Sequence, residues 1–256
     1  MIPDTMHLTL RQLRLGGVIN SLDVRLQEAA GASMSHLQFL ELILQDEVVL
    51  RTQRQIERRT KAASFRNVTT LDQFDFRFNK VNRQLIFQLA TGQFIRDGRD
   101  VLFFGPPGVG KSHLAQAIGR HAIRQGYLVL YKSIFDLARD FMIEEALGND
   151  SRVLRNYLKV DLLIIDDMGM KELTRKGTEY LLEVIMRRHG LKSTMMTSNR
   201  PIEDWGKLLG DNAAATAILD RLMNNSDLIQ IAGSSYRLKQ RNCNPENNAI
   251  DVPNQY

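Results

Sequence analysis

Apolar residues recur with a helical period over residues 1 to about 65. The first series runs up to a Gly-Ala-Ser interruption at 31–33, and its members are Leu10, Leu13, Val18, Leu22 and Leu26. Ser35 then precedes Gln38 by three positions, a spacing typical of a capping box, which predicts that a second helix begins there. Its apolar stripe consists of Leu37, Leu40, Ile43, Leu44 and Val48. We therefore expect a small all-helical N-terminal module.

The pattern changes over residues 70–240, where short apolar runs alternate with helical periods. The runs are "VLFF" (101–104), "YLVLY" (127–131), "DLLIID" (161–166), "STMMTSN" (193–199) and "LIQI" (228–231). Such alternation predicts parallel strands joined by crossover helices, and thus an α/β fold with helices flanking the sheet. The expected organisation is a helical module at 1–66, an α/β domain at 67–241 and a flexible tail at 242–256 that is rich in Asn.

The composition says more about the partner and the cellular compartment of the protein than about the reaction it carries out. The 256 residues carry a net charge of +5, which favours an acidic partner such as nucleic acid. The one cysteine, Cys243, excludes a disulfide framework within the chain and suits a reducing compartment. The sequence shows no signal-peptide pattern and no apolar run near the ~18 residues of a membrane span. We therefore expect a cytoplasmic protein without membrane association.

A phosphate-binding loop follows the first apolar run. "GPPGVGKS" matches the P-loop pattern G-x-x-x-x-G-K-[ST], with a strand before it and an amphipathic helix after it. Glycines let backbone N–H groups surround phosphate oxygens, and the helix N-terminus adds partial positive charge. The expected ATP contacts are Gly105, Pro106, Pro107, Gly108, Val109, Gly110, Lys111, Ser112 and His113. Lys111 is suited to the β- and γ-phosphates, and the Ser112 hydroxyl to Mg²⁺.

Two adjacent carboxylates end a later apolar run, "LLIIDD" at 162–167. In P-loop proteins a second strand delivers an acid beside the phosphate-bound Mg²⁺. Asp166 is expected to end the strand of 162–165 and to hold this ion, directly or through water. Asp167 would face the γ-phosphate and orient or deprotonate the attacking water.

A polar amide follows another predicted strand, because "TMMTSNRP" ends its apolar part with Thr197, Ser198 and Asn199. Asn199 can hydrogen-bond the attacking water or the γ-phosphate, which is the sensor-1 role in AAA+ ATPases. Asn is common at strand ends, so the interpretation depends on the loop and the two aspartates as well.

Taken in order, "GPPGVGKSHLA", "LLIIDDMGM", "TSNRPIEDW", "ILDRLMNNS" and "SSYRLK" resemble the IstB-like transposition helper ATPases, which are AAA+ proteins similar to the DnaC-like helicase loaders. The resemblance covers about residues 68–240. It implies that Arg221 is an arginine finger for a neighbouring subunit and that Arg237 is a sensor-2 residue, with Arg200 a second candidate for the contact between subunits. It also implies that 70–76 packs near adenine, although Phe74 and Phe76 could equally be core residues. Asp167 stands where Glu is usual, so slow hydrolysis is expected.

Two basic clusters are candidates for DNA contacts. In the stretch 51–66, Arg51, Arg54, Arg58 and Lys61 fall on one face if the segment is helical, and Arg59 and Arg66 lie beside them. A second cluster follows the two aspartates and consists of Lys171, Arg175 and Lys176. Neither resembles a base-reading motif, so contacts with the phosphates of duplex DNA and a weak sequence preference are expected. The alternative for each cluster is a solvated surface.

The sequence therefore predicts an Mg²⁺- and ATP-dependent AAA+ ATPase that oligomerises on DNA. The resemblance implies that it selects or remodels target DNA and recruits or activates a transposase. A replicative helicase loader is the nearest alternative, since it shares the ATPase core. A metabolic P-loop kinase belongs to a different class. It would need a substrate pocket and an Arg-rich lid, and would not need the Asn sensor or an arginine from a neighbour.

Overall fold

The structure is a computed structural model of the chain, and it describes residues 3–147, 150–170, 173–201, 204–205, 212–236 and 239. Contacts divide the chain into two compact units, Met1–Arg59 and Thr60–Tyr256, which we call the N-terminal and C-terminal units. The predicted tail at 242–256, with Cys243, lies outside the described residues.

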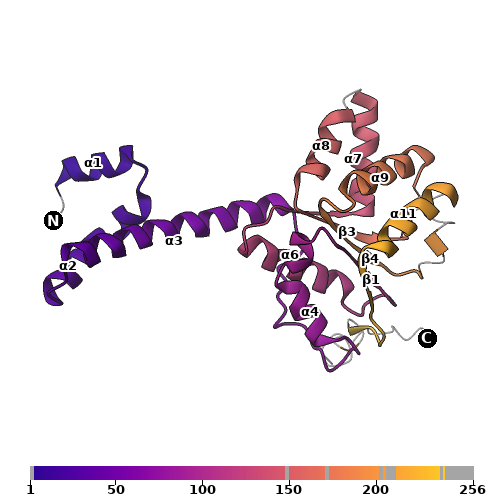
Figure 1. The fold of residues 1–256 in the computed structure, drawn as a ribbon, viewed down its shortest axis with the longest axis horizontal. Coiled ribbons are helices and arrows are strands. Elements are labelled where there is room, and N and C mark those ends of the chain that lie inside the picture. The colour runs from indigo at the N-terminus through magenta and orange to yellow at the C-terminus, as the bar shows by residue number, and fades with distance from the viewer. Residues whose placement is uncertain are drawn as a thin grey trace, which may run out of the picture. The chain divides into compact units, whose positions relative to one another are not determined.

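The N-terminal unit is helical, as expected (Figure 1). It contains α1 (Asp4–Gln12), α2 (Gly16–Gly31) and most of α3 (His36–Ala63). The periodic series up to residue 31 is therefore two helices, because the chain turns between them with Arg14 in the left-handed region at φ 57°. Gly16 and Gly17 follow directly as the first two residues of α2, a turn signal that the apolar period alone does not include.

The predicted capping box opens α3. The Ser35 backbone N–H donates to Gln38 Oε1 at 3.0 Å, and the Gln38 N–H donates to Ser35 Oγ at 3.3 Å. The helix then runs for 28 residues and ends in the basic stretch. None of the helices in the described ranges is both long enough and apolar enough to cross a bilayer.

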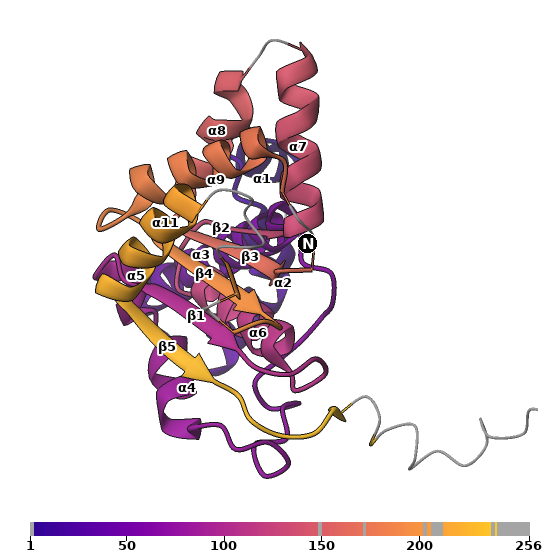
Figure 2. The ribbon, with the colours of Figure 1, turned by 90° about the vertical axis from the view of Figure 1, so that its right-hand side faces the viewer.

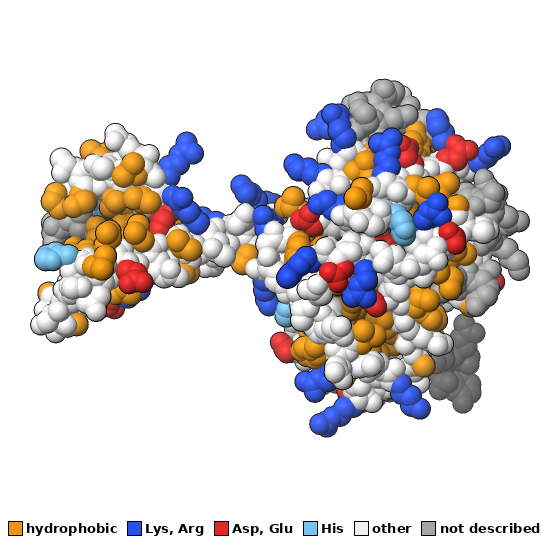
Figure 3. Space-filling model, viewed as in Figure 1, with side chains coloured by type: hydrophobic (Ala, Val, Ile, Leu, Met, Phe, Trp, Pro, Cys, Tyr) orange, Lys and Arg blue, Asp and Glu red, His pale blue; other side chains and the backbone are white. Residues whose placement is uncertain are grey.

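The hydrophobic core of the N-terminal unit is small. It consists of Leu10, Val18, Leu22 and Ile43, with Leu15, Ile19 and Phe39 packed against it. Of the predicted stripe on α3, only Ile43 is buried, whereas Leu37, Leu40, Leu44 and Val48 are exposed. Apolar side chains accordingly gather on the visible surface of this unit (Figure 3).

The C-terminal unit is built on a five-stranded sheet in the order β2-β3-β4-β1-β5, with every neighbouring pair parallel. The strands are β1 (Asp100–Phe104), β2 (Val129–Ser133), β3 (Leu162–Met168), β4 (Ser193–Ser198) and β5 (Ser226–Gln230). The predicted α/β class and parallel sheet are thus confirmed. Because the strands are parallel, their carboxyl ends meet at one edge, where the P-loop begins.

Helices cover both faces of the sheet (Figure 2). On one face α6 (Lys111–Arg124) contacts four of the strands and packs against α4 (Arg83–Ala90), next to α5 (Gln93–Arg96). The other face carries α7 (Ile134–Leu147), α8 (Asp150–Lys159), α9 (Arg175–Arg188) and α11 (Asn212–Asn224). Their core includes Leu102, Ile165 and Met196 from the strands and the buried Trp205.

The bounds of several predicted strands need correction, and the run expected at 228–231 lies in β5, which begins at Ser226 and ends at Gln230. The strand expected at 127–131 begins at Val129, because Tyr127 and Leu128 belong to the turn after α6. The strand expected to end at Asp166 continues to Met168 through a register shift between Ile165 and Met168. The apolar run stops at Ile165, although the strand remains paired with its neighbour beyond this residue. Hydropathy therefore predicted where the strand becomes polar and did not predict where it ends.

Candidate nucleotide-binding site

The loop between β1 and α6 requires glycine at defined positions. Gly105 has φ 148°, and a Cβ there would lie 2.2 Å from the carbonyl oxygen of Ile231. Gly110 has φ 99°, and its Cβ would lie 2.5 Å from the ring of Phe74. An L side chain is disfavoured at both positions by backbone conformation as well as by space. The two glycines of the motif therefore permit the close approach of segments that are distant in sequence.

Three separate segments hold the loop from outside. The Gly105 N–H donates to the Ser198 carbonyl at 3.2 Å, and the Tyr236 N–H donates to the Gly108 carbonyl at 3.0 Å. The Asn79 side-chain amide donates to the Val109 carbonyl at 2.8 Å. Two of these bonds occupy backbone carbonyls of the loop, and the first one uses the N–H of Gly105. Of the three, only this first bond takes an N–H group that the loop could offer to phosphate.

Lys111 is the first residue of α6 and is 5% exposed. Its Nζ donates to the carbonyls of Gly105 and Pro106, at 2.8 and 2.7 Å. The ammonium is thus held inside the loop, close to the N-terminus of a 14-residue helix. Both the cation and the helix N-terminus favour an anionic ligand at this place.

Asp166 is 1% exposed and accepts hydrogen bonds from three hydroxyl groups. Ser112 Oγ donates to its Oδ1 at 2.8 Å, and the Thr197 hydroxyl donates to the same oxygen. The Tyr131 hydroxyl donates to Oδ2, and burial together with the nearby Asp166 charge raises the pKa of Tyr131. Residues of α6, β2 and β4 therefore stabilise one buried carboxylate on β3.

Asp167 points elsewhere, because it lies at the register shift of β3 with φ 63°. A bulge of this kind changes the direction of a side chain, and non-glycine residues rarely adopt a positive φ. The Asp167 N–H donates to Thr197 Oγ1 at 3.1 Å, and its carboxylate pairs with Arg66 at 3.3 Å. Burial and the neighbouring Asp166 raise the pKa of Asp167, whereas Arg66 opposes this rise. The backbone thus separates two charges that are adjacent in sequence.

Asn199 directly follows β4, between β3 and β1, at the strand edge that carries the loop and the aspartates. Next to it, Arg200 Nε donates to the Gly169 carbonyl at 3.1 Å. Arg221 lies on α11 and pairs with Asp220 at 2.8 Å. Arg237, the predicted sensor-2 residue, lies outside the described residues. The structure thus places Asn199 at the same edge of the sheet as the loop, and the roles of Asn199, Arg200 and Arg221 stay predictions.

Aromatic side chains lie beside the loop. Phe74 contacts Phe76 edge to face at 4.8 Å between ring centroids, and its centroid is 5.7 Å from that of His113. A ring nitrogen of His113 lies 2.8 Å from the Thr70 carbonyl, so this side chain faces the 70–76 segment. Phe74 and Phe76 are only partly buried, which favours the reading that they flank the loop over the reading that they are core residues.

The basic candidates are placed on helices. Arg51, Arg54, Arg58, Arg59 and Lys61 all lie within α3, so the helical condition for the stripe is met. Arg51 also serves the fold, since it pairs with Glu47 at 2.6 Å and donates to the Arg14 carbonyl at 3.2 Å. In the second cluster, Arg175 and Lys176 begin α9. Lys171 lies outside the described residues. Contact with DNA stays a prediction for both clusters.

Sequence reasoning missed several neighbours of the two aspartates. Tyr131 and Thr197 bond Asp166, and Arg66 links Asp167 to Asp136, which lies 3.8 Å from its guanidinium. Alternation along β2 identifies Tyr131 as inward-facing but does not reveal its partner. Arg66 looked like one more charge in a basic run, and nothing local indicates that it faces a carboxylate 101 residues away.

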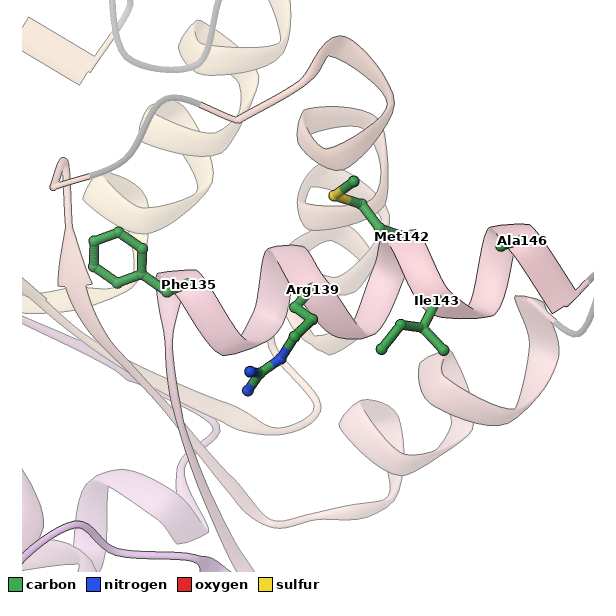
Figure 4. Close-up of a pocket in the computed structure, with 5 residues that line it drawn as sticks. All are labelled: Phe135, Arg139, Met142, Ile143 and Ala146. Carbon is green, nitrogen blue, oxygen red and sulfur yellow. The ribbon is translucent and has the colours of Figure 1, made fainter.

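A pocket elsewhere contains none of these groups. It is lined by Phe135, Arg139, Met142, Ile143 and Ala146, all from α7 (Figure 4). Among the described residues its lining is apolar apart from the Arg139 guanidinium. The loop at 105–112 is therefore the candidate nucleotide site.

Comparison with known proteins finds a family and relatives that are named as ATP-binding proteins. The family model of the IstB-like ATP binding protein matches residues 8–244. The insertion sequence IS21 putative ATP-binding protein of Pseudomonas aeruginosa is 35% identical over 237 residues, which are 92% of this chain and 89% of that protein. The insertion sequence IS5376 putative ATP-binding protein of Geobacillus stearothermophilus is 33% identical over 244 residues, 95% of this chain and 97% of that protein.

Solved structures resemble the fold. The crystal structure of the DnaC helicase loader has a TM-score of 0.51 and 23% identity, and the match covers 68% of this chain and 99% of that one. AMPPCP-bound DnaA from Aquifex aeolicus has a TM-score of 0.55 and 22% identity over 74% of this chain and 58% of that one. Both are AAA+ proteins, so the predicted AAA+ core is confirmed at the level of the fold.

Proposed function

The chain belongs to the IstB-like ATP-binding protein family, and from this premise we propose that it is a DNA-stimulated ATPase that assembles on duplex DNA and assists a transposase. One observation supports hydrolysis most directly. Lys111, Ser112, Asp166 and Asp167 come together from two separate stretches of sequence, with Asn199 at the same edge of the sheet. ATP binding alone needs the loop, whereas the two carboxylates and the amide are needed for bond cleavage.

The residues present fit Mg²⁺. This ion prefers oxygen ligands, and Ser112 Oγ and Asp166 Oδ1 lie 2.8 Å apart beside the loop. Ser112 and Asp166 would hold the ion, and a bound Mg²⁺ supplies charge that offsets the phosphate oxygens. Tyr131 and Thr197 would keep the Asp166 carboxylate oriented, because both hydroxyls already donate to it.

Each remaining side chain has a distinct chemical task. Lys111 neutralises charge on the β- and γ-phosphates from within the loop. Asp167 accepts the proton of the attacking water, and a raised pKa makes it a better base than an ordinary aspartate. Asn199 orients the water or the γ-phosphate through its amide. Arg221 of a second copy, or Arg200 in its place, stabilises the charge that develops as the γ-phosphate leaves.

The DNA part of the proposal depends on α3 and on the relatives. A helical face with Arg54, Arg58 and Lys61 can follow a phosphate backbone without reading bases. The similar proteins are named as proteins of insertion sequences, and this context supports a transposase as partner. A replicative helicase loader is less well supported, because the likeness to DnaC is one of fold at 23% identity.

The test measures ATP binding and hydrolysis separately, with and without duplex DNA. Lys111→Ala should lose ATP binding, whereas Asp167→Asn should bind ATP with turnover lower by ~10²-fold or more. Phosphate release that DNA stimulates and that needs no small-molecule acceptor would separate an ATPase from a kinase. Equal loss of nucleotide binding in both variants would contradict the assigned roles.

A further inference from the structure

The chain that leaves α3 lies along the helix that follows the nucleotide loop. We call residues 65–70 the strap, and both the strap and α6 belong to the C-terminal unit. The contacts of the strap come from one face of α6, because the residues that make them are three and four positions apart, namely His113, Gln116 and Arg120. The strap is thus attached to α6 over about two helical turns.

Gln116 makes the central contact of the strap. This residue is 1% exposed, and its Oε1 accepts a hydrogen bond from the Asn67 N–H at 3.1 Å. Its Nε2 donates to the Ser112 carbonyl at 3.1 Å, one turn earlier in α6. One buried amide therefore joins the backbone of the strap to the backbone of the last residue of the P-loop motif.

The two ends of the strap are fixed as well. Phe65 packs on α6, where a Cβ on Gly119 would lie 3.0 Å from its ring, and the Arg120 guanidinium lies 5.8 Å from its ring centroid. At the other end, the Thr70 carbonyl lies 2.8 Å from a ring nitrogen of His113. The strap therefore cannot shift along α6 without disturbing contacts at three levels of the helix.

The strap continues directly from the helix that carries the basic stripe. This helix, α3, begins in the N-terminal unit and ends at Ala63, which is buried. Only Ser64, in the left-handed region at φ 58°, separates α3 from Phe65. Because the connection is so short, a displacement of the end of α3 reaches the strap without being absorbed by intervening residues.

We propose that the strap couples DNA binding on α3 to the nucleotide loop, and that Gln116 is the positioning residue that transmits this coupling to the first turn of α6. The inference rests on the proposed DNA-stimulated ATPase and adds the route by which DNA acts on it. The first turn of α6 carries Lys111 and Ser112, the residues proposed to hold phosphate and Mg²⁺. A shift of Asn67 moves the backbone of this turn through Gln116, and a misplacement of about 1 Å in a catalytic site can change a rate by ~10²-fold.

The test compares Gln116→Met with Gln125→Met in the full chain. Methionine keeps the length of the side chain but forms neither hydrogen bond. Gln125 is a matched control, because it directly follows α6 and its Nε2 donates to a backbone carbonyl of another segment, that of Ala90, at 2.8 Å.

Gln116→Met should keep the affinity for duplex DNA, the KM for ATP and the kcat without DNA. The ratio of kcat with saturating DNA to kcat without it should fall by roughly fivefold, the factor expected for the loss of one buried hydrogen bond. Gln125→Met should keep the ratio of the parent.

A second variant loosens the strap without altering α6. A Gly-Ser-Gly-Ser segment inserted after Ser64 leaves the contacts of Phe65, Asn67 and Thr70 in place and adds a flexible connection between α3 and the strap. This variant should bind DNA and hydrolyse ATP at the basal rate, but DNA should no longer stimulate it.

Retained stimulation in either variant would overturn the proposed coupling, and so would an equal loss in Gln125→Met. A fall of kcat by the same factor with and without DNA would show that Gln116 serves only the stability of α6. Loss of DNA affinity in either variant would assign the effect to DNA binding and would also contradict the coupling. If DNA stimulates the parent, the proposed function stands whatever these variants do. If DNA does not stimulate the parent, both fail.

Discussion

The two units use hydrophobic sequence in different ways. The C-terminal unit buries its apolar runs inside a sheet that is covered on both faces, and Leu162 to Ile165 are all fully buried. The N-terminal unit is richer in leucine, with 11 among its 59 residues, but leaves many of them exposed, so that Leu37 and Leu13 are 75% and 61% exposed. A strand in a sheet that is covered on both faces buries its side chains on either side. An amphipathic helix in a three-helix unit has too few neighbouring helices to cover all of its apolar side chains. Periodicity thus predicts burial well in the first case and poorly in the second.

Polar contacts compensate for the small hydrophobic core of the N-terminal unit. Glu47 on α3 is 5% exposed and accepts from the Gly17 N–H at 2.6 Å and the Val18 N–H at 3.4 Å, at the start of α2. Arg51 pairs with the other carboxylate oxygen at 2.6 Å. A buried carboxylate at a helix N-terminus is favourable because it satisfies N–H groups that have no partner within the helix. This unit therefore depends on a few defined contacts, while the C-terminal unit depends on its core.

The largest effect on ATP hydrolysis is expected at Arg221, because this residue is predicted to act on the nucleotide of a second copy of the chain. Arg221→Ala should bind ATP but hydrolyse it ~10²-fold more slowly, because the leaving phosphate loses a stabilising charge. Lys111→Ala keeps Arg221 but lacks the binding loop. Mixing the two variants on DNA should restore turnover that neither shows alone, as measured by phosphate release. If both assemble on DNA and the mixture stays inactive, Arg200 becomes the candidate for the contact between subunits.

The next prediction concerns packing between α2 and α3. A Cβ on Gly17 would lie 2.6 Å from the Glu47 Cα and 2.7 Å from the Asp46 carbonyl, which are backbone atoms that cannot move aside. Gly17→Ala should therefore cost about 2 kcal/mol, even after the gain in helix propensity. Urea unfolding followed by far-UV circular dichroism measures this loss. Trp205, the one tryptophan, is buried in the C-terminal unit, so its fluorescence transition should not shift.

Gly31→Ala is the matched control within the same helix. No atom lies within 4 Å of its added Cβ, so the substitution should be neutral or stabilise slightly. A loss as large as that of Gly17→Ala would show that flexibility of α2, and not its distance from α3, determines the stability of the unit.

A third prediction tests whether the exposed face of α3 binds DNA. Replacing Arg54, Arg58 and Lys61 with Ala should weaken binding to all duplex sequences alike. The slope of log affinity against log salt should become shallower by about 0.9 for each lost phosphate contact. A control with the same loss of charge replaces exposed arginines of the C-terminal unit, namely Arg96, Arg124 and Arg187. Equal effects in both triple variants would indicate general attraction and no defined DNA site on α3.

The smallest effect concerns pH and the contact between α2 and α3. Hydrogen bonds from Arg25, and from Ser21, lower the pKa of Asp46 to about 2. The folded-state pKa lies below the unfolded value of about 3.9, so this contact stabilises the unit above pH ~4 and the contribution is lost as the pH falls toward 2. The free energy of unfolding of Asp46→Asn, measured by denaturation at several pH values, should lack this pH-dependent contribution. An identical pH profile in the parent and the variant would contradict it.

The sequence predicted the nucleotide loop, the parallel sheet and the capping box at Ser35 because each is determined by local chemistry. Glycine conformations, strand periodicity and a three-residue cap spacing can be read from a few neighbouring letters. The left-handed conformations of Arg14 and Asp167 could not be predicted in this way, since neither residue is a glycine. The partners of the aspartates were missed for another reason, because Tyr131 and Arg66 come from segments that only the tertiary fold brings near.

The bonds that tie the loop to Ser198, Asn79 and Tyr236 have a consequence for local opening of the chain. A ligand that fixes the loop also raises the free energy needed to detach these three segments, since each must break a bond to the loop in order to open. Slow exchange of amide hydrogens should therefore extend beyond the residues that a nucleotide touches. The backbone N–H groups of Gly105 and Tyr236 would record occupancy of the loop from two separate parts of the sequence, which makes nucleotide binding visible even in variants that cannot hydrolyse ATP.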